Sequence, residues 1–148
     1  MTRLFLATAL GLAVATGAGA EMITKQSPHS VAETMDKLVA AVEGAGATVF
    51  ARVDHAEGAA SVEMELRPTQ MLMFGNPKLG TPLMQMSQSA GLDLPLRVVV
   101  WEAEDGTVTL GYHDPADMVV AHGVPINAEI VPTMQGALDK LTGAAVAE

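Results

Sequence analysis

The sequence contains no cysteine and few aromatic residues. Without cysteine, the 148-residue chain has no disulfide, no thiol nucleophile and no cysteine-ligated metal. Three Phe, one Trp and one Tyr leave much of the core volume to other side chains, and ten Met are available to fill it. Methionine is an adaptable core residue. Packing of aliphatic and Met side chains therefore has to stabilise the fold, and self-association could supplement it.

Basic side chains are also scarce. Eight Lys and Arg stand against seventeen Asp and Glu, which gives a net charge of −9. An acidic surface repels phosphate backbones and anionic lipids, so it disfavours binding to nucleic acid or to a membrane surface. With 49% hydrophobic residues, a chain of this length is expected to bury one core, as a single domain over residues 21–148.

The first 20 residues have the layout of a secretory signal peptide. Arg3 precedes an apolar run from Leu4 to Ala15, and the small residues Ala18, Gly19 and Ala20 follow. A spanning helix needs roughly 20 apolar residues, so the run is short for a retained membrane anchor. We expect cleavage after Ala20 and a periplasmic or secreted protein that is not membrane-bound. Loss of Arg3 leaves seven basic against seventeen acidic residues, a net charge of −10.

Hydrophobic periodicity and turn residues predict alternating strands and helices. The first helix should begin at a cap on Ser27 or Ser30 and end at Gly44 or Gly46, and Asp105-Gly106 predicts a hairpin turn. The last helix should be kinked or divided at Pro132. Strands are expected over residues 22–26, 48–53, 69–74, 94–102 and 107–112; further helices are expected over 54–65 (with a strand as the alternative), 81–90, 116–122 and 127–142. This order predicts an α+β fold, a single antiparallel or mixed sheet of about five strands with helices packed on one face.

The segment from Gly75 to Thr81 lies between a predicted strand and a predicted helix, as a phosphate-binding loop would. Its chemistry differs, because Thr81 stands where such a loop needs Lys, and Pro77 removes a backbone amide. A tight strand-to-helix turn with Asn76 as the helix cap is the preferred interpretation. A small anion held at the helix start near Lys78 remains an alternative.

Histidines and methionines suggest two kinds of metal site. Thioethers suit Cu(I), but core filling accounts for the methionines without metal. No His-x-x-x-His spacing is present, so surface or capping roles are the preferred interpretation of the histidines. The residues concerned are His55, His113 and His122 with Asp54, Asp93 and Asp114 for a general metal site, and Met71, Met73, Met84 and Met86 for copper.

No catalytic motif stands out. The serines at 61, 87 and 89 lack the sequence of a nucleophile elbow, and no spacing selects an acid–base pair among Asp93, Glu102 and Asp114. Trp101 and Tyr112 fall on the two strands of the predicted hairpin. They could flank a ligand pocket or a dimer contact, although core packing is the preferred interpretation.

Several short motifs together resemble the uncharacterised domain-of-unknown-function family 302. They are Asp54-His55, Arg67-Pro68-Thr69, Phe74-Gly75-Asn76-Pro77, Gly80-Thr81-Pro82-Leu83-Met84, Asp93-Leu94-Pro95-Leu96, Trp101-Glu102 and Tyr112-His113-Asp114-Pro115. The resemblance implies a small α+β domain with helices on one side of a sheet, frequent self-pairing and no established reaction. His113 departs from the Asn that the family usually has there.

By this resemblance, the family's recurrent polar positions would line a shared pocket or a self-association surface. With His113 added, they are Asp54, His55, Asn76, Asp93, Glu102, Tyr112, His113 and Asp114.

Three hypotheses about function follow. The first is an exported, noncatalytic homodimer that binds a small ligand, a metal or a protein partner. The second is a hydrolase or isomerase that uses His55 or His113 with a neighbouring Asp as an acid–base pair. The third is purely structural self-association, with Trp101 in the contact. No motif identifies a cofactor.

Overall fold

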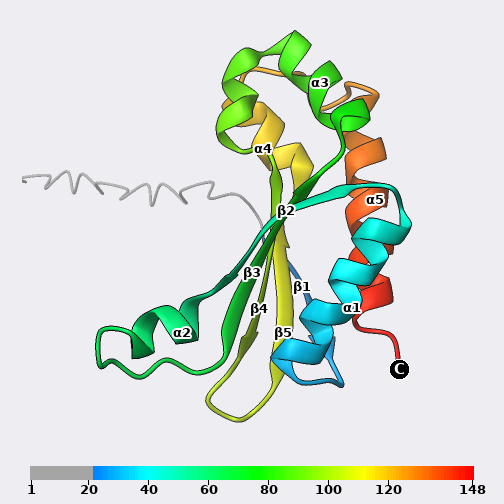
Figure 1. Cartoon of the computed structure of the whole chain (residues 1–148). Helices are drawn as coiled ribbons and strands as arrows, with labels where there is room; N and C mark the ends of the chain where they lie inside the picture. The colour runs from blue at the N-terminus through cyan, green and yellow to red at the C-terminus, as the bar shows by residue number, and fades with distance from the viewer. Residues whose placement is uncertain (1–21) are drawn as a thin grey trace, which may run out of the picture.

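The computed structural model describes residues 22–148, and the expected signal peptide lies outside this range. Five strands form one antiparallel sheet in the order β1-β5-β4-β3-β2 (Figure 1). The strands are β1 (Met22–Ser27), β2 (Thr48–Asp54), β3 (Thr69–Gly75), β4 (Leu96–Glu102) and β5 (Val108–His113). The predicted α+β fold is confirmed, and the sheet is entirely antiparallel.

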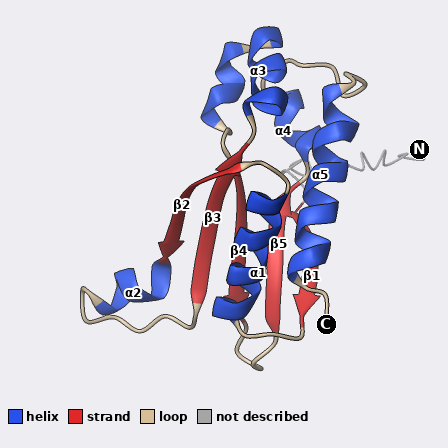
Figure 2. Ribbon diagram, turned by 45° about the vertical axis from the view of Figure 1, so that its right-hand side comes forward, coloured by secondary structure: helices blue, strands red, loops and turns tan. Residues whose placement is uncertain are grey.

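Two long helices cover one face of this sheet, and the shorter helices lie beyond its two ends (Figures 1 and 2). Helices α1 and α5 lie side by side on the covered face, whereas α2 extends from one end of the sheet and α3, η1 and α4 gather at the other. The helices are α1 (Val31–Gly44), α2 (His55–Ala60), α3 (Pro77–Met86), the 3₁₀ helix η1 (Gln88–Leu92), α4 (Pro115–Ala121) and α5 (Ile130–Ala145).

The hydrophobic core has two parts. The larger part packs the covered face of the sheet against α1 and α5; its fully buried members include Met35, Leu38, Leu72, Val98 and Leu110. The smaller part joins α3, η1 and α4 to the first half of α5. Its members are Leu83, Ala90, Val119, Val124, Val131 and Met134. Helix α5 takes part in both and therefore fixes the end-cluster of helices relative to the sheet.

Local capping chemistry sets the starts of two helices as predicted. Ser30 and Glu33 form a reciprocal capping box at α1. The Asp54 side chain accepts a hydrogen bond from the Glu57 amide at 3.0 Å, which begins α2. Helix α2 buries no residue and ends at Ala60, so the helix expected over 54–65 is shorter than predicted.

The predicted starts of two helices at Thr81 and Asn127 are wrong, although Asn76 caps a helix as predicted. Helix α3 begins at Pro77 with Asn76 as its cap, ahead of the expected start at Thr81. Helix α5 begins at Ile130, so Pro132 lies in its first turn. First-turn amides have no acceptor within their own helix, so proline is tolerated there and the predicted kink does not form.

The other face of the sheet is left uncovered by the described helices (Figure 1). Strand register places three rows of residues on it. They are Thr24, Gly111, Val99, Met71 and Val53; Gln26, Thr109, Trp101 and Thr69; and Met22, His113, Arg97, Met73 and Ala51. Tyr112 is buried on the opposite face, so Trp101 and Tyr112 cannot flank one pocket.

Candidate functional site

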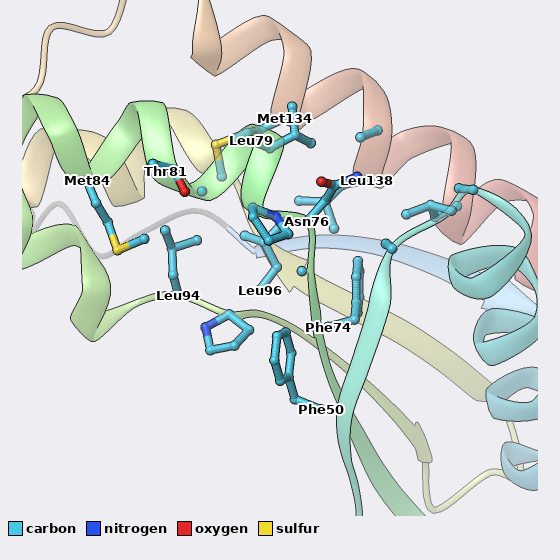
Figure 3. A pocket seen from close by; sticks show the side chains of 18 of the residues that line it. Phe50, Phe74, Asn76, Leu79, Thr81, Met84, Leu94, Leu96, Met134 and Leu138 are labelled. Atoms are coloured by element: carbon cyan, nitrogen blue, oxygen red, sulfur yellow. The ribbon is translucent and has the colours of Figure 1, made fainter.

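The main cavity is an apolar cleft at the end of the sheet where α3 begins. Its volume is about 400 Å³, and its walls come from the α1–β2 turn, the facing ends of β3 and β4, α3, the segment after η1, and α5 (Figure 3). Phe50 and Phe74 lie on one side, with Met84 and Leu94 from the α3–η1 region and Leu138 from α5 also lining the space. The two core clusters meet here without filling the gap between them.

A β-bulge places Phe50 at this cleft. The pairing of β2 with β3 shifts register between Val49 and Ala51, which leaves Phe50 without a cross-strand partner. Bulges re-aim side chains in this way. Phe50 remains 58% exposed while lining the cleft, so it forms part of the cleft's open rim.

Among residues 22–148, Asn76 and Thr81 supply the polar side chains of the cleft, and no charged side chain lines it. The Asn76 Oδ1 atom accepts the Lys78 amide at 2.9 Å, which caps α3. Because that bond uses the oxygen, the Nδ2 amide of Asn76 is left as a donor at the cleft. Of the site residues expected from the sequence, Asn76 lies here and the other seven do not.

The expected site residues are divided between the two ends of the sheet. Asp54 and Glu102 lie at the end near α2, since their strands pair there with Gln70 and Val108, and His55 begins α2. The opposite end holds Asn76, Asp93, Tyr112, His113 and Asp114. A single pocket shared by all eight is therefore not formed. The Tyr112 side chain belongs to the buried core.

Two of these aspartates cap helices. The Asp54 carboxylate accepts Glu57 N at 3.0 Å and Gln70 Nε2 at 2.9 Å, and the first of these bonds is the main reason that the pKa of Asp54 is lowered. Asp114 Oδ1 accepts Ala116 N at 2.8 Å and Gln135 Nε2 at 2.7 Å, which ties α4 to α5. These bonds give both aspartates a structural role.

The histidine paired with a carboxylate is His122. Its Nε2 atom lies 2.6 Å from Asp93 Oδ2, and its Nδ1 atom lies 3.0 Å from Ser89 Oγ. The imidazole is 7% exposed, and the other Asp93 oxygen contacts Arg97 at 3.2 Å. His55 and His113 are exposed, so the acid–base pair expected at either of them lacks the contact that it requires.

The direction of these hydrogen bonds follows when His122 is neutral. An ionised Asp93 accepts, so His122 Nε2 carries the proton and Nδ1 accepts from the Ser89 hydroxyl. The bonds join the end of α4 to η1, which adds stability to the helices beside the cleft. The sequence named Asp93 and His122 but could not pair them, because 29 residues separate them.

A second depression is too small for an organic ligand. It encloses about 40 Å³ beside Asp93, Arg97 and His113. Such a volume suits one or two water molecules. Within residues 22–148, no group of three or more His, Asp or Glu side chains is arranged to hold a metal ion. In the same range, no helix is both long and apolar enough to traverse a bilayer.

The sequence is similar to part of three curated proteins. It is 41% identical over 109 residues to "Fluoride-specific ion channel FluC 1" of Brucella suis, an alignment that covers 74% of this chain and 43% of that protein. The proteins named "Fluoride-specific ion channel FluC 1" in Brucella abortus and "FluC 2" in Brucella melitensis match at the same identity over 40% of their length. The chain therefore spans less than half of these relatives, and their names describe longer proteins.

A solved structure has the same fold. The crystal structure of an uncharacterised conserved DUF302 protein from Bacillus stearothermophilus superimposes with a TM-score of 0.76 at 20% identity, over 84% of this chain and 97% of that one. The family model described as "Domain of unknown function DUF302" matches residues 23–141, which include every strand from β2 to β5 and the whole cleft. The chain belongs to the DUF302 family.

Proposed function

We propose that this domain is a noncatalytic binding module that holds a small, mainly apolar ligand in the cleft between β3, α3 and α5. The observation that carries the proposal is the cleft itself, about 400 Å³ of space lined by apolar side chains with two polar ones. Ligand pockets have this character, and their volumes are roughly 300–1,000 Å³. A protein that needed only stability would gain by filling such a space.

We also propose that two copies pair through the uncovered face of the sheet. Met71, Met73, Val99 and Trp101 provide apolar area there. Among the residues that register places on this face there is no carboxylate, although the chain carries a net charge of −9. Two copies that met at this face would therefore avoid the repulsion between their acidic surfaces.

The proposal also includes export of the protein from the cytoplasm. The apolar run after Arg3 and the small residues before Glu21 support cleavage after Ala20 and a periplasmic or secreted location. A chain without cysteine gains nothing from an oxidising compartment, but it also has no thiol that could be damaged there. N-terminal sequencing of protein recovered from the producing cell's exported fraction should begin at Glu21; a chain that still carried Arg3 would contradict export with cleavage.

A variant in which a large side chain fills the cleft tests whether the cleft binds the ligand. Ala137 lines the cleft from α5, whereas Lys140 lies on the exposed side of the same helix. Ala137→Trp should abolish binding of neutral aromatic probes in a thermal-shift panel, and Lys140→Trp should leave it unchanged. Native mass spectrometry of protein purified from its own export compartment should show a retained mass in the unmodified chain. If no apolar probe stabilises the unmodified protein, the proposal is wrong.

A second candidate function, hydrolysis, is favoured by the chain of hydrogen bonds from Ser89 through His122 to Asp93. The groups follow one another as in a serine hydrolase, with the roles of the two imidazole nitrogens exchanged. Ser89 Oγ would attack an ester carbonyl, its proton would move to His122 Nδ1, and the leaving alcohol would take that proton; water would then release the acyl group. Ser89 is exposed and lies outside the cleft lining, so binding is the better supported function.

A fluorophosphonate probe distinguishes the two functions. A nucleophilic Ser89 would be labelled at neutral pH, and labelling would be lost in Ser89→Ala but kept in Ser87→Ala. Ser87 is the matched control because its hydroxyl lies 3.0 Å from Ser89 Oγ and does not contact His122. Absence of labelling would rule out Ser89 as the nucleophile of a hydrolase and would leave the binding proposal intact.

A further inference from the structure

We infer that the ligand of the cleft is a neutral, flat apolar molecule with one hydrogen-bond acceptor, and that the Asn76 side-chain amide donates to this acceptor. The inference rests on the proposed binding function and adds the chemical class of the ligand. Three features of the cleft carry it: the absence of charge in its lining among the described residues, the amide donor that the α3 cap holds in place at Asn76, and aromatic and glycine surfaces on its walls.

The lining excludes an ionised ligand. In the part of the chain that the structure describes, no Asp, Glu, Lys, Arg or His contributes to the cleft, so a buried carboxylate, phosphate or ammonium group would have no partner of opposite charge there. Moving such a group from water into apolar surroundings is strongly unfavourable unless it is paired. An anion faces a further penalty, because the protein itself carries a net charge of −9.

The polar contacts of the cleft favour an acceptor on the ligand. In the cap of α3, the Lys78 amide donates a hydrogen bond to the Asn76 side chain. The Asn76 atom that accepts this bond must be the oxygen, Oδ1. The bond therefore identifies which end of the Asn76 amide is nitrogen, and that nitrogen is free to donate. The cap also holds the side chain in place, so little entropy is lost when the nitrogen binds a ligand. A carbonyl oxygen is the simplest group that fits.

The walls favour a flat ligand. Phe50 packs close to the backbone of Gly75, where a Cβ would lie 3.5 Å from Phe50 Cε2. Gly80 and Gly91 also line the cleft and leave its α3 and η1 walls without side chains at these positions. The Met84 thioether is part of the same lining, and sulfur contacts with aromatic ring edges are favourable. An aromatic ring system would fit beside these surfaces.

Three related compounds test the inference directly. The first is 2-acetylnaphthalene, which is neutral and carries one carbonyl; the second is 2-isopropenylnaphthalene, in which a CH₂ group replaces that oxygen; the third is the anion 2-naphthoate. Isothermal titration of the full mature chain should give about tenfold tighter binding of the ketone than of the hydrocarbon, as expected for one net hydrogen bond. The anion should bind at least tenfold more weakly than the ketone.

The variant Asn76→Asp shows whether the amide is responsible. Aspartate keeps an oxygen that can cap α3, but it has no N–H to offer. In this variant the ketone should lose its tenfold advantage over the hydrocarbon. Comparing the two compounds within the same variant cancels general effects of the substitution on folding or on the cleft. Circular dichroism should show that the helical content is unchanged.

The possible results separate this inference from the proposed function. Equal affinity for the ketone and the hydrocarbon in the unmodified chain would overturn the inference, and the binding function would stand. A ketone advantage that persisted in Asn76→Asp would also overturn it, since another group would then be the donor. Tightest binding of the anion would overturn the argument from charge. If none of the three compounds bound, the inference would be overturned; if no apolar probe of the thermal-shift panel bound either, the proposed function itself would fail.

Discussion

Trp101 lies across Gly111 on the neighbouring strand of the uncovered sheet face. A Cβ atom at Gly111 would be only 3.0 Å from Trp101 Cζ3 and 3.2 Å from the Met22 sulfur. Contacts of this length are tighter than nine in ten of those that real Cβ atoms make, so glycine at this position lets the indole pack close against the sheet. The largest side chain of the uncovered face is thus held in a defined position by its neighbour.

Gly111→Ala should therefore destabilise the fold. The added methyl group requires the indole and the Met22 side chain to give way by a few tenths of an ångström, and overpacking in a confined site costs about 1–3 kcal/mol. Urea unfolding followed by circular dichroism measures the loss. Gly136→Ala is the matched control, because nothing lies within 4 Å of the position that its methyl group would take on α5. That variant should gain up to about 1 kcal/mol from higher helix propensity. A neutral Gly111→Ala would show that the indole is free to move.

The uncovered face should mediate dimer formation. Val99→Glu places a carboxylate at the centre of the row that also holds Met71 and Gly111, and in a two-fold dimer it would do so on both copies. Sedimentation analysis should show a dimer for the unmodified chain and a shift toward monomer for the variant. Lys140→Glu makes a larger change in net charge on an exposed part of α5 and should leave the dimer intact. An unmodified chain that stayed monomeric at every concentration would contradict the prediction.

The His122 network should contribute measurably to stability. His122→Ala removes both hydrogen bonds of a nearly buried imidazole and leaves Asp93 with Arg97 alone. A cost of about 1–3 kcal/mol is expected, because a polar group loses its partner in a site of low exposure. His55→Ala is the control, since His55 is exposed on α2, a helix without buried residues. Its effect on the free energy of unfolding should stay within about 0.5 kcal/mol.

The sequence predicted most of the fold because its strands and caps depend on local signals. Alternating apolar residues, with turn residues between the runs, identified five strands. The Ser30–Glu33 pair and Asp54 identified two helix starts. The start of α3 was misplaced because both Asn76-Pro77 and Thr81-Pro82 have the composition of a helix start. The Asn76 side chain makes the capping bond, as the sequence had favoured for this turn, and Thr81-Pro82 lies inside the helix that begins there.

The candidate site was far less predictable. Asn76 was named from the sequence, but the apolar lining of the cleft was not, since Phe50, Phe74 and Leu138 have the same appearance in a sequence as core residues. The bulge that turns Phe50 to the cleft is a property of strand pairing. The contact between His122 and Asp93 likewise depends on how α4 packs beside η1. Polar residues at strand ends suggested a shared pocket. In an antiparallel sheet, however, neighbouring strands run in opposite directions, so these residues lie at both ends of the sheet.

Asp54 should make α2 sensitive to acid. Hydrogen bonds from the Glu57 amide and Gln70 lower the pKa of the folded Asp54 carboxyl below its ordinary value. The stability from this cap is therefore fully present above the unfolded-state pKa of about 3.9, and it is lost as the pH falls through the lower, folded pKa. Asp54→Asn keeps a capping oxygen and removes the titration, whereas Asp54→Ala removes the cap and should fray α2 at every pH.

The amide resonance of Glu57 in ¹H–¹⁵N spectra reports the hydrogen bond to Asp54 directly. It should move with acid further in the unmodified chain than in Asp54→Asn, and in Asp54→Ala it should lie near the frayed position throughout. Because α2 buries no side chain, the resonances of α1 and α5 should not follow it; if they did, the cap would be supporting the whole fold rather than one helix.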